Sequence, residues 1–533
     1  MNKSFDFPAD GNYFLITGMP TPNGRIHLGH IAGPYLRMDV LKRKVQRNNG
    51  KAYLCSGSDV YESYVELKAN QLHQSPEDVA NYFHELIIKD FKALDIEFDI
   101  FTNPLTDGNL QEFKQRQQTL IKEWISGGHV VEFDEMIPYD PISGRYLTGC
   151  WIQGACPNCN KKTGSYLCEN CGFHYKPQDI LNFKDYPGVI MQSAKCLYLK
   201  LDIQAVMENA KKIQNAKFVQ LLESYIRSQG PYIRLTTMQQ TGIPFIWDSV
   251  KGQVVFTYTG LLLFSIICGD ILQNTYGLEQ NPMAATSGFI CCASFGIDNV
   301  IPFLAGIHAG GLLLPGYRPF DYYFCNYFYY LNGQKFSTSK SHVIWAADII
   351  ELSNIQPDAV RYFLCKINPE LQTENFDTYH FVRTINEDLC EGINNAVRYA
   401  MGYLTGGEIY EINERLFPDI ENIVFKQEQS AVPEDFSLTL FLEPITEWID
   451  YFDTATEKDS QFCYWWLKTL AYLCYPIMPR FAQSVWSQLT GNFIVARTDY
   501  YESKVVISAE TEKIAFHIIE YTQVEKSLPK IQN

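Results

Sequence analysis

Tyr13-Phe14-Leu15-Ile16-Thr17, followed by Pro20-Thr21-Pro22-Asn23-Gly24 and then by His27-Leu28-Gly29-His30, is the stretch that decides the fold. The apolar run predicts a buried strand, the prolines and Gly24 predict a turn, and the segment from about His27 onward predicts the start of a helix. Residues three apart share a face of a helix, so His27 and His30 should lie together over Gly29, which has no side chain to block a ligand.

A strand, a turn and a helix start in this order are typical of a phosphate site. Exposed backbone N–H groups and the positive end of the helix dipole attract anions, and imidazoles can donate hydrogen bonds to a reacting phosphate. A histidine pair alone is more commonly a surface or capping pair. The second element is Gly333-Gln334-Lys335-Phe336-Ser337-Thr338-Ser339-Lys340-Ser341, which alone would be interpreted as a solvated polar loop.

Together the two elements resemble the HIGH and KMSKS signatures of class I aminoacyl-tRNA synthetases. Their spacing and surroundings resemble the methionyl-tRNA synthetase branch, and the resemblance extends over most of the chain. It implies a ligase that attacks the α-phosphorus of ATP with an amino-acid carboxylate, releases pyrophosphate, and passes the acyl group to the 3′ end of a tRNA. The cofactors that it implies are ATP, Mg²⁺ and a structural Zn²⁺.

The expected fold class is α/β, with a Rossmann-type parallel-sheet catalytic domain. We expect its first half at residues 1–129 and its second half, with the KMSKS-like loop, at 188–356. Alternating strand and helix signals favour the parallel sheet. Short strands, prolines, glycines and cysteines predict an inserted connecting subdomain with a zinc knuckle at 130–187. Helical spacing predicts a C-terminal helical bundle at 357–533, and the resemblance implies that this bundle is similar to an anticodon-binding domain.

Composition describes a soluble globular protein, with 46% hydrophobic and 20% charged residues. The formal net charge of −16 argues against a general nucleic-acid coat. Lys42-Arg43-Lys44 with Arg47 is a candidate local basic face for tRNA. The first residues lack the apolar core of a signal peptide, and the longest apolar run, Leu261 to Cys268, is too short to cross a bilayer. We therefore expect a cytoplasmic protein without a membrane partner, of undetermined oligomeric state.

Two Cys-x-x-Cys pairs, Cys156 with Cys159 and Cys168 with Cys171, are separated by eight residues. Each pair can supply two corners of a tetrahedron, and four sulfur ligands close a zinc site to water, which makes it structural. Disulfides are the alternative, but a cytoplasmic chain keeps its thiols reduced. Methionyl-tRNA synthetases carry a similar knuckle in their connecting insertion.

The resemblance also implies the nucleotide site. His27, His30, Lys335 and Lys340 would act at the phosphates, the lysines on a mobile loop. The family's second KMSKS lysine is Thr338 here, and Lys340 would take its place. The other residues expected to bind ATP are Pro20, Asn23, Gly24, Gly29, Ser337 and Ser339.

The amino-acid pocket departs from the family pattern. Ser56-Gly57-Ser58-Asp59 resembles the Thr-Gly-Thr-Asp segment whose aspartate holds the substrate α-amino group, but the following His-Gly reads Tyr61-Glu62. The Trp-x-Asp-Ala-Pro segment reads Tyr258-Thr259-Gly260-Leu261-Leu262, and the Gly-Lys-Asp segment reads Gly296-Ile297-Asp298. Thr21 replaces a pocket tyrosine and Phe303 a pocket histidine. The residues expected to bind the amino acid are Met19, Thr21, Asp59, Tyr258, Leu261, Leu262 and Phe303. These changes should alter which amino acid fits.

The segment from Phe381 to Tyr399 resembles the first helix of the anticodon domain. Asn395 falls at the family's anticodon-reading asparagine, Tyr399 falls where the family has an arginine, and Arg398 is adjacent, so all three are expected to bind tRNA. Three functions stay open: a ligase that loads tRNA with methionine or a replacement amino acid, an enzyme that adenylates an amino acid for amide ligation to a non-tRNA acceptor, and a catalytically weak tRNA-binding protein.

Overall fold

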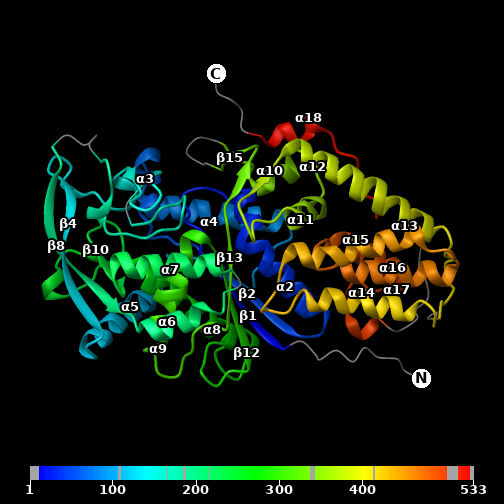
Figure 1. The fold of residues 1–533 in the computed structure, drawn as a ribbon, viewed down its shortest axis with the longest axis horizontal. Helices are drawn as coiled ribbons and strands as arrows, with labels where there is room; N and C mark the ends of the chain where they lie inside the picture. Colours follow the sequence, from blue (N-terminus) through cyan, green and yellow to red (C-terminus); the bar gives the residue numbers. More distant parts are fainter. Residues whose placement is uncertain are drawn as a thin grey trace.

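A parallel five-stranded sheet lies at the centre of the computed structural model (Figure 1), which describes residues 11–105, 110–164, 166–183, 188–213, 215–336, 342–411, 414–500 and 514–528. Its strand order is β13-β12-β1-β2-β3. The strands are β1 Asn12–Thr17, β2 Lys51–Gly57, β3 Ile100–Thr102, β12 Phe289–Gly296 and β13 Tyr322–Asn326. The predicted Rossmann-type parallel sheet is confirmed.

Strand β1 is buried on both faces, which explains its continuous apolar run. Tyr13 and Leu15 belong to a core shared with helix α2 (Leu36–Arg47) and the C-terminal helices. Phe14 and Ile16 belong to a second core shared with helix α8 (Thr257–Tyr276). Successive residues of a strand point to opposite faces, so one strand anchors both cores.

Helix α4 begins at residues that favour a helix start. Ser75 caps α4, because its Oγ accepts the Asp78 N–H at 3.0 Å, and Pro76 occupies the first turn. The helices of this part are α1 Leu28–His30, α3 Ser63–Leu72, α4 Pro76–Ala93, α5 Leu110–Ser126, α6 Ile203–Ala210, α7 Ala216–Gln229, α9 His308–Leu312 and α10 Ala346–Glu351.

The strand order reverses at β1. The chain passes from β1 to β2 on one side and returns from β3 to β12 on the other, which opens a crevice at the carboxyl ends of β1 and β12. The Gly18 N–H donates to the Ser294 carbonyl at 2.9 Å across this end of the sheet. The turn that carries His27 therefore starts where open α/β sheets bind their ligands.

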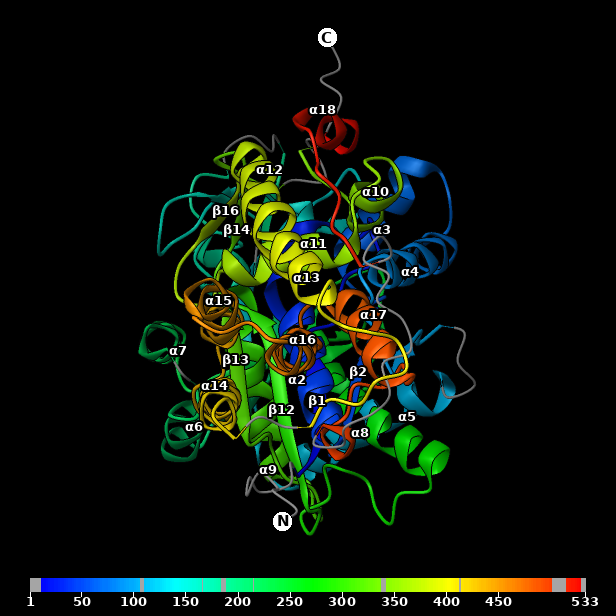
Figure 2. The ribbon, with the colours of Figure 1, turned by 90° about the vertical axis from the view of Figure 1, so that its right-hand side faces the viewer.

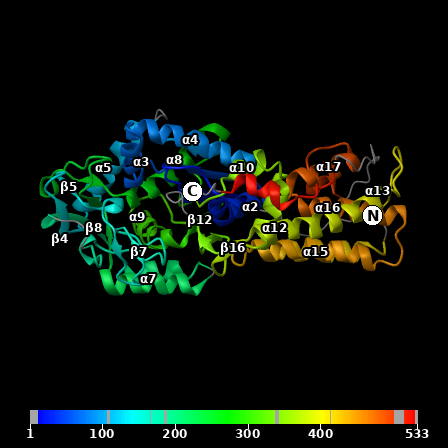
Figure 3. The same cartoon turned by 90° about the horizontal axis from the view of Figure 1, so that it is seen from above.

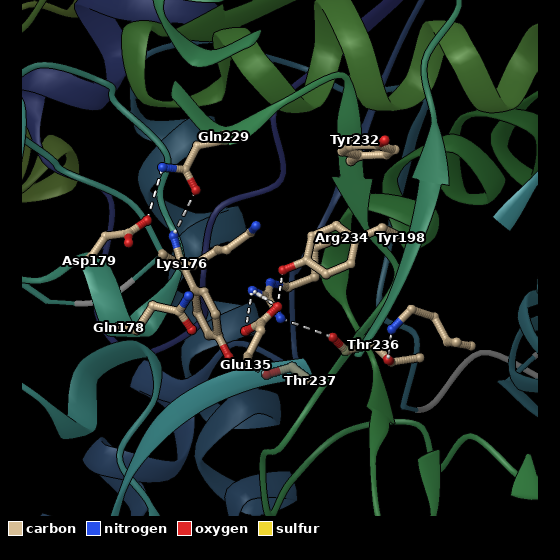
Figure 4. Close-up of polar contacts among 12 residues, drawn as sticks. Glu135, Lys176, Gln178, Asp179, Tyr198, Gln229, Tyr232, Arg234, Thr236 and Thr237 are labelled. Carbon is tan, nitrogen blue, oxygen red and sulfur yellow. Dashed lines mark hydrogen bonds and ion pairs between the residues drawn. The ribbon is translucent and has the colours of Figure 1, made fainter. Parts of the chain in front are cut away.

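The insertion forms an antiparallel sheet in the order β5-β4-β8-β9. Its strands are β4 Val130–Asp140, β5 Arg145–Tyr146, β8 Ile190–Lys200 and β9 Tyr232–Arg234, with the short strands β6 Gly154–Ala155, β7 Lys162–Thr163, β10 Thr236–Thr237 and β11 Val254–Val255 nearby. Because β8 pairs with β4 and β9 pairs with β8, this sheet extends past the boundary predicted at residue 187. Arg234 Nη2 lies 2.8 Å from both carboxylate oxygens of Glu135, which ties β9 to β4 (Figure 4).

The C-terminal part is a helical bundle, as the helical spacing predicts. Figure 3 shows the insertion at one end of an elongated molecule, the sheet in the middle and the bundle at the other end, and Figure 2 shows the bundle in front of the sheet. Its helices are α11 Pro357–Lys366, α12 Thr378–Thr384, α13 Asn394–Met401, α14 Phe417–Gln429, α15 Leu438–Thr454, α16 Ser460–Cys474, α17 Pro479–Thr490 and α18 Tyr521–Val524. Strands β14 Tyr329–Leu331, β15 Gln334–Lys335 and β16 Glu374–Phe376 link it to the sheet. Within the described ranges, every helix is too short or too polar to span a membrane.

The prediction that Lys42, Lys44 and Arg47 form a surface basic face is wrong. All three are buried on α2. Glu428 of α14 accepts Lys44 at 2.9 Å and Arg47 at 2.6 Å, while Lys42 lies 2.7 Å from Asp99. The charges face inward because α2 is enclosed between the sheet and the bundle, and they join these two parts.

Removing Glu428 should therefore destabilise the contact between the sheet and the bundle. Glu428→Ala leaves two buried cations without a carboxylate, and we expect the free energy of unfolding to fall by about 3–5 kcal/mol in urea titrations. The matched control is Glu447→Ala, which removes the half-exposed ion pair with Lys426 on the bundle surface and should cost only about 0–1 kcal/mol. Equal effects of the two substitutions would contradict this role of Glu428.

Candidate nucleotide and amino-acid site

His27 and His30 face one another at the end of the turn. His27 is the N-cap of α1, and its Nδ1 accepts the His30 N–H at 3.3 Å. In return, the Nδ1 of His30 accepts the His27 N–H at 3.3 Å. The two ring centroids lie 3.7 Å apart in a stacked arrangement. The sequence predicts both imidazoles on one face of a helix, and the structure brings them together through this reciprocal cap.

These hydrogen bonds fix the tautomers of both rings. Because each Nδ1 accepts a backbone N–H, a neutral ring must carry its proton on Nε2. Burial lowers the pKa of His30 to about 4. Burial also lowers the pKa of His27, and the neighbouring His30 and Lys335 lower it further. At pH 7 the pair therefore offers two neutral Nε2–H donors.

The second motif and the segment after it pack directly on the first motif. The Phe336 ring stacks on His27 with centroids 4.6 Å apart. The Leu28 N–H donates to the Ile344 carbonyl at 3.0 Å, and the Ala346 N–H donates to the Ile26 carbonyl at 2.9 Å. A Cβ at Gly29 would lie 3.0 Å from the Phe336 ring. Glycine at this position thus permits the close approach of two segments that are about three hundred residues apart in the sequence.

Asp90 of α4 holds this junction together, and the sequence analysis missed it. Its carboxylate accepts the Ile26 N–H and the Ala347 N–H, each at 3.0 Å, so it bonds both segments at once. It also pairs with Arg25 at 2.7 Å, and Arg25 reaches Asp348 at 2.8 Å. The only signal in the sequence is an acid among the apolar residues of α4, which does not by itself distinguish a buried carboxylate from an exposed one.

Lys335 lies at the edge of the site and points to the knuckle. Its Nζ donates to the Glu169 carbonyl at 2.8 Å and lies 3.5 Å from Glu169 Oε2. Pro20 and Asn23 shape the turn, since the Pro20 carbonyl accepts the Asp59 N–H at 3.0 Å and the Asn23 N–H donates to Thr21 at 2.9 Å. Gly24 lies in the same turn. Ser337, Thr338, Ser339 and Lys340 lie outside the described residues.

The four knuckle cysteines converge on one point. Their Sγ atoms all lie within 4.8 Å of one another. Cys156 and Cys171 are 3.8 Å apart, and Cys159 and Cys168 are 3.6 Å apart. A tetrahedral zinc with Zn–S bonds of about 2.3 Å needs sulfur atoms about 3.8 Å apart, whereas a disulfide needs about 2.05 Å. The cluster therefore has the geometry of a tetrahedral metal site, and these cysteines are free thiols.

The knuckle forms one wall of the site. Gly172 packs so closely on the end of β12 that a Cβ there would lie 2.4 Å from the Ile297 carbonyl, and its φ of +71° also favours glycine. Glu169, inside the second Cys-x-x-Cys pair, contacts Lys335 and accepts the Tyr64 hydroxyl at 3.2 Å. A metal bound by the cysteines would thus position groups that touch the second motif.

A cavity of about 120 Å³ opens between the sheet end, α8 and the knuckle. Of the residues expected to bind the amino acid, Met19, Asp59, Tyr258 and Leu261 border it. The structure places the others elsewhere. Phe303 is buried in the core, where its ring stacks on Phe295 at 4.4 Å, and Leu262 is buried against Gly310. Thr21 lies in the turn, outside the cavity lining.

Asp59 and Tyr258 are held by residues around the cavity. Thr257 donates to Asp59 Oδ2 at 3.1 Å, and burial raises the pKa of Asp59 to about 6. The Tyr258 hydroxyl bonds to His174 Nδ1, while His174 Nε2 donates to the Asp298 carbonyl at 2.8 Å. His174 follows the knuckle, so it links α8 to the insertion. The sequence does not predict a role for His174, because a single histidine after the last cysteine carries no distinctive spacing.

The residues expected to bind tRNA lie on one exposed face of α13, at the far end of the bundle from the cavity (Figure 3). Arg398 Nη1 donates to Asn395 Oδ1 at 3.2 Å. The Tyr399 hydroxyl lies 3.0 Å from the Tyr403 hydroxyl, and Lys458 lies 5.9 Å from the Tyr399 ring. This face therefore offers hydrogen-bond donors and aromatic rings to a large ligand.

Comparisons with known proteins agree with this geometry. The chain is 27% identical over 400 residues to a methionine–tRNA ligase of Roseiflexus castenholzii, an alignment that covers 69% of this chain and 65% of that protein. The chain thus spans about two thirds of that relative. It is also 27% identical over 522 residues to a methionine–tRNA ligase of Thermoplasma volcanium, covering 89% of this chain and 92% of that protein.

The fold is also that of a solved synthetase. The structure of Mycobacterium tuberculosis methionyl-tRNA synthetase in complex with methionyl-adenylate matches with a TM-score of 0.69 at 15% identity, covering 93% of this chain and 98% of that one. The family model described as "tRNA synthetases class I (M)" matches residues 13–256 and 294–401, which is more than half of the chain. The chain therefore belongs to the class I tRNA synthetases of the methionyl type.

Proposed function

We propose that the protein is an ATP-dependent ligase that forms an aminoacyl-adenylate and transfers the acyl group to tRNA. The observation that carries this proposal is the junction of the two motifs, where Phe336 stacks on His27 at the sheet crevice. Asp59, which falls at the family's α-amino position, lies beside the same turn, because its N–H donates to the Pro20 carbonyl. Family membership and the relatives' names support the same reaction.

The chain's own groups position the reactants and stabilise charge. The Nε2–H donors of His27 and His30 would hydrogen-bond the phosphates, whose charge grows during attack on the α-phosphorus. Lys335 would leave Glu169 to contact the departing pyrophosphate, and Asp59 would hold the α-ammonium so that the carboxylate faces the nucleotide. Mg²⁺ is the expected companion of ATP and would neutralise the remaining phosphate charge.

The test of adenylation is amino-acid-dependent exchange of pyrophosphate into ATP across a panel of amino acids. His30→Ala removes one donor and should lower the exchange rate about 100-fold while the protein stays folded. His129→Ala, at an exposed histidine outside the site, is the control and should retain the full rate. If none of the amino acids supports exchange, the proposed adenylation is overturned. An unchanged exchange rate in His30→Ala would overturn the role of this histidine.

Charging of total tRNA tests the acceptor. If α13 binds tRNA, the double substitution Arg398→Ala with Tyr399→Ala should raise the KM for tRNA about tenfold, a loss of about 1.4 kcal/mol, and leave pyrophosphate exchange unchanged. Arg383→Ala, an exposed arginine on α12, is the control. Exchange without charging of any tRNA would instead support a non-tRNA acceptor.

We propose that the knuckle holds one structural Zn²⁺, on the basis of the tetrahedral spacing of its four sulfur atoms. Metal analysis should find one zinc per chain, and Cys156→Ser with Cys159→Ser should abolish it. A structural zinc contributes on the order of 10 kcal/mol to its fold, so the insertion should become sensitive to proteases. Cys150→Ser, in the same insertion, should keep the metal. A protease-resistant knuckle without metal would contradict this proposal.

A further inference from the structure

We propose that the amino acid activated at this site carries a second cationic group on its side chain, and that Glu62 binds this group while Asp59 holds the α-ammonium. The substrate would then be a diamino acid with an unbranched side chain. This inference rests on the proposed adenylation and concerns only which amino acid is bound.

The cavity lining combines apolar and aromatic residues with several acidic ones. Four carboxylates border it, those of Asp59, Glu62, Glu169 and Asp298, and the described residues of its lining include no lysine or arginine. A pocket for an apolar side chain would present apolar walls and few acids. The residue composition of this cavity thus points to a ligand that brings positive charge.

Two of the four acids have a cation nearby. Lys335 lies 3.5 Å from Glu169. Burial raises the pKa of Asp298, and the charge of Lys335 opposes this effect. Asp59 and Glu62 differ, because no cation among the described residues acts on either of them. Burial and hydrogen bonds from Thr257 and the Tyr61 N–H act on Asp59. Burial and the Asp59 charge raise the pKa of Glu62 to about 8, opposed only by a hydrogen bond from the Ser63 N–H.

Among the described residues, Glu62 forms no ion pair with a cation. It stands at the N-cap of α3 in an extended conformation, but its side chain makes no capping hydrogen bond. The family pattern has a glycine at this position. Enclosing a carboxylate without a counter-charge costs free energy. A ligand ammonium group would offset that cost, whereas a methionine side chain would not.

The rest of the lining suits an unbranched stem with a polar end. Met19 and Leu261 offer apolar surface beside Asp59 for a methylene chain. Tyr61 also borders the cavity, and its buried hydroxyl oxygen has no hydrogen-bond partner among the described residues. A second amino group could bond to this hydroxyl and to Glu62 together.

The experiment compares lysine with norleucine, which has an unbranched side chain but no second ammonium, and adds ornithine, 2,4-diaminobutyrate and methionine. Calorimetry on the full chain measures binding independently of turnover, and pyrophosphate exchange measures activation. We expect at least one of the three diamino acids to bind at least tenfold more tightly than norleucine and methionine, and to support the fastest exchange.

Variants then locate the selectivity. Glu62→Gln keeps the shape but removes the charge, and Glu62→Gly restores the residue of the family pattern. Both should reduce the preference for the diamino acid at least tenfold, and Glu62→Gly should raise the relative affinity for methionine or norleucine. Glu85→Gln, an exposed acid on α4, is the control for loss of one negative charge and should keep the preference.

The two failures are distinguishable. If a neutral amino acid binds and exchanges best in the unmodified protein, or if the preference for a diamino acid survives in both Glu62 variants, the inference is overturned while adenylation stands. If calorimetry shows the diamino preference and its loss in the Glu62 variants but no amino acid supports exchange, the binding inference is supported and the proposed ligase activity is overturned. Absence of binding by every amino acid tested overturns the inference.

Discussion

The site depends on one buried carboxylate, that of Asp90. It accepts the backbone N–H groups of Ile26, just before the first motif, and of Ala347, just after the second. Buried donors must find partners, so satisfying both with one side chain fixes the distance between two remote segments. The stacking of His27 on Phe336 follows from this constraint. Helix α4, which carries neither motif, thus holds together the two segments that we propose to bind phosphate.

The insertion completes the site from the other side. Its sulfur cluster sets the path of the chain through Glu169 and Gly172, which contact Lys335 and the end of β12. His174 then ties α8 to the same unit through Tyr258. A metal bound by the four cysteines would thereby shape both the position of Lys335 and one wall of the candidate cavity. The insertion and the candidate site therefore share the contacts that hold them in place.

The sequence predicts the elements well where a local pattern has a single physical solution. The run Tyr13–Thr17 forms the buried strand that its apolar residues predict, and the two Cys-x-x-Cys pairs converge as their spacing predicts. The sequence does not predict the burial of a side chain when that burial depends on partners far away in the chain. In the sequence the basic residues of α2 resemble a surface patch, but in the structure Lys44 and Arg47 are buried and pair with Glu428. Likewise, the sequence around Asp90 suggests an exposed acid on a helix. The boundary predicted at residue 187 leaves β8 and β9 out of the insertion, because the sequence does not show that β8 pairs with β4 and β9 with β8.

The central claim is that the paired imidazoles and the Phe336 segment form one receptor for the triphosphate of ATP. A crystal structure of the full chain with a non-hydrolysable ATP analogue tests it most directly. We predict phosphate oxygens within hydrogen-bond distance of the Nε2 atoms of His27 and His30, with Lys335 turned from Glu169 toward the phosphates. A triphosphate bound away from both histidines, with the crevice at β1 and β12 empty, would contradict the account.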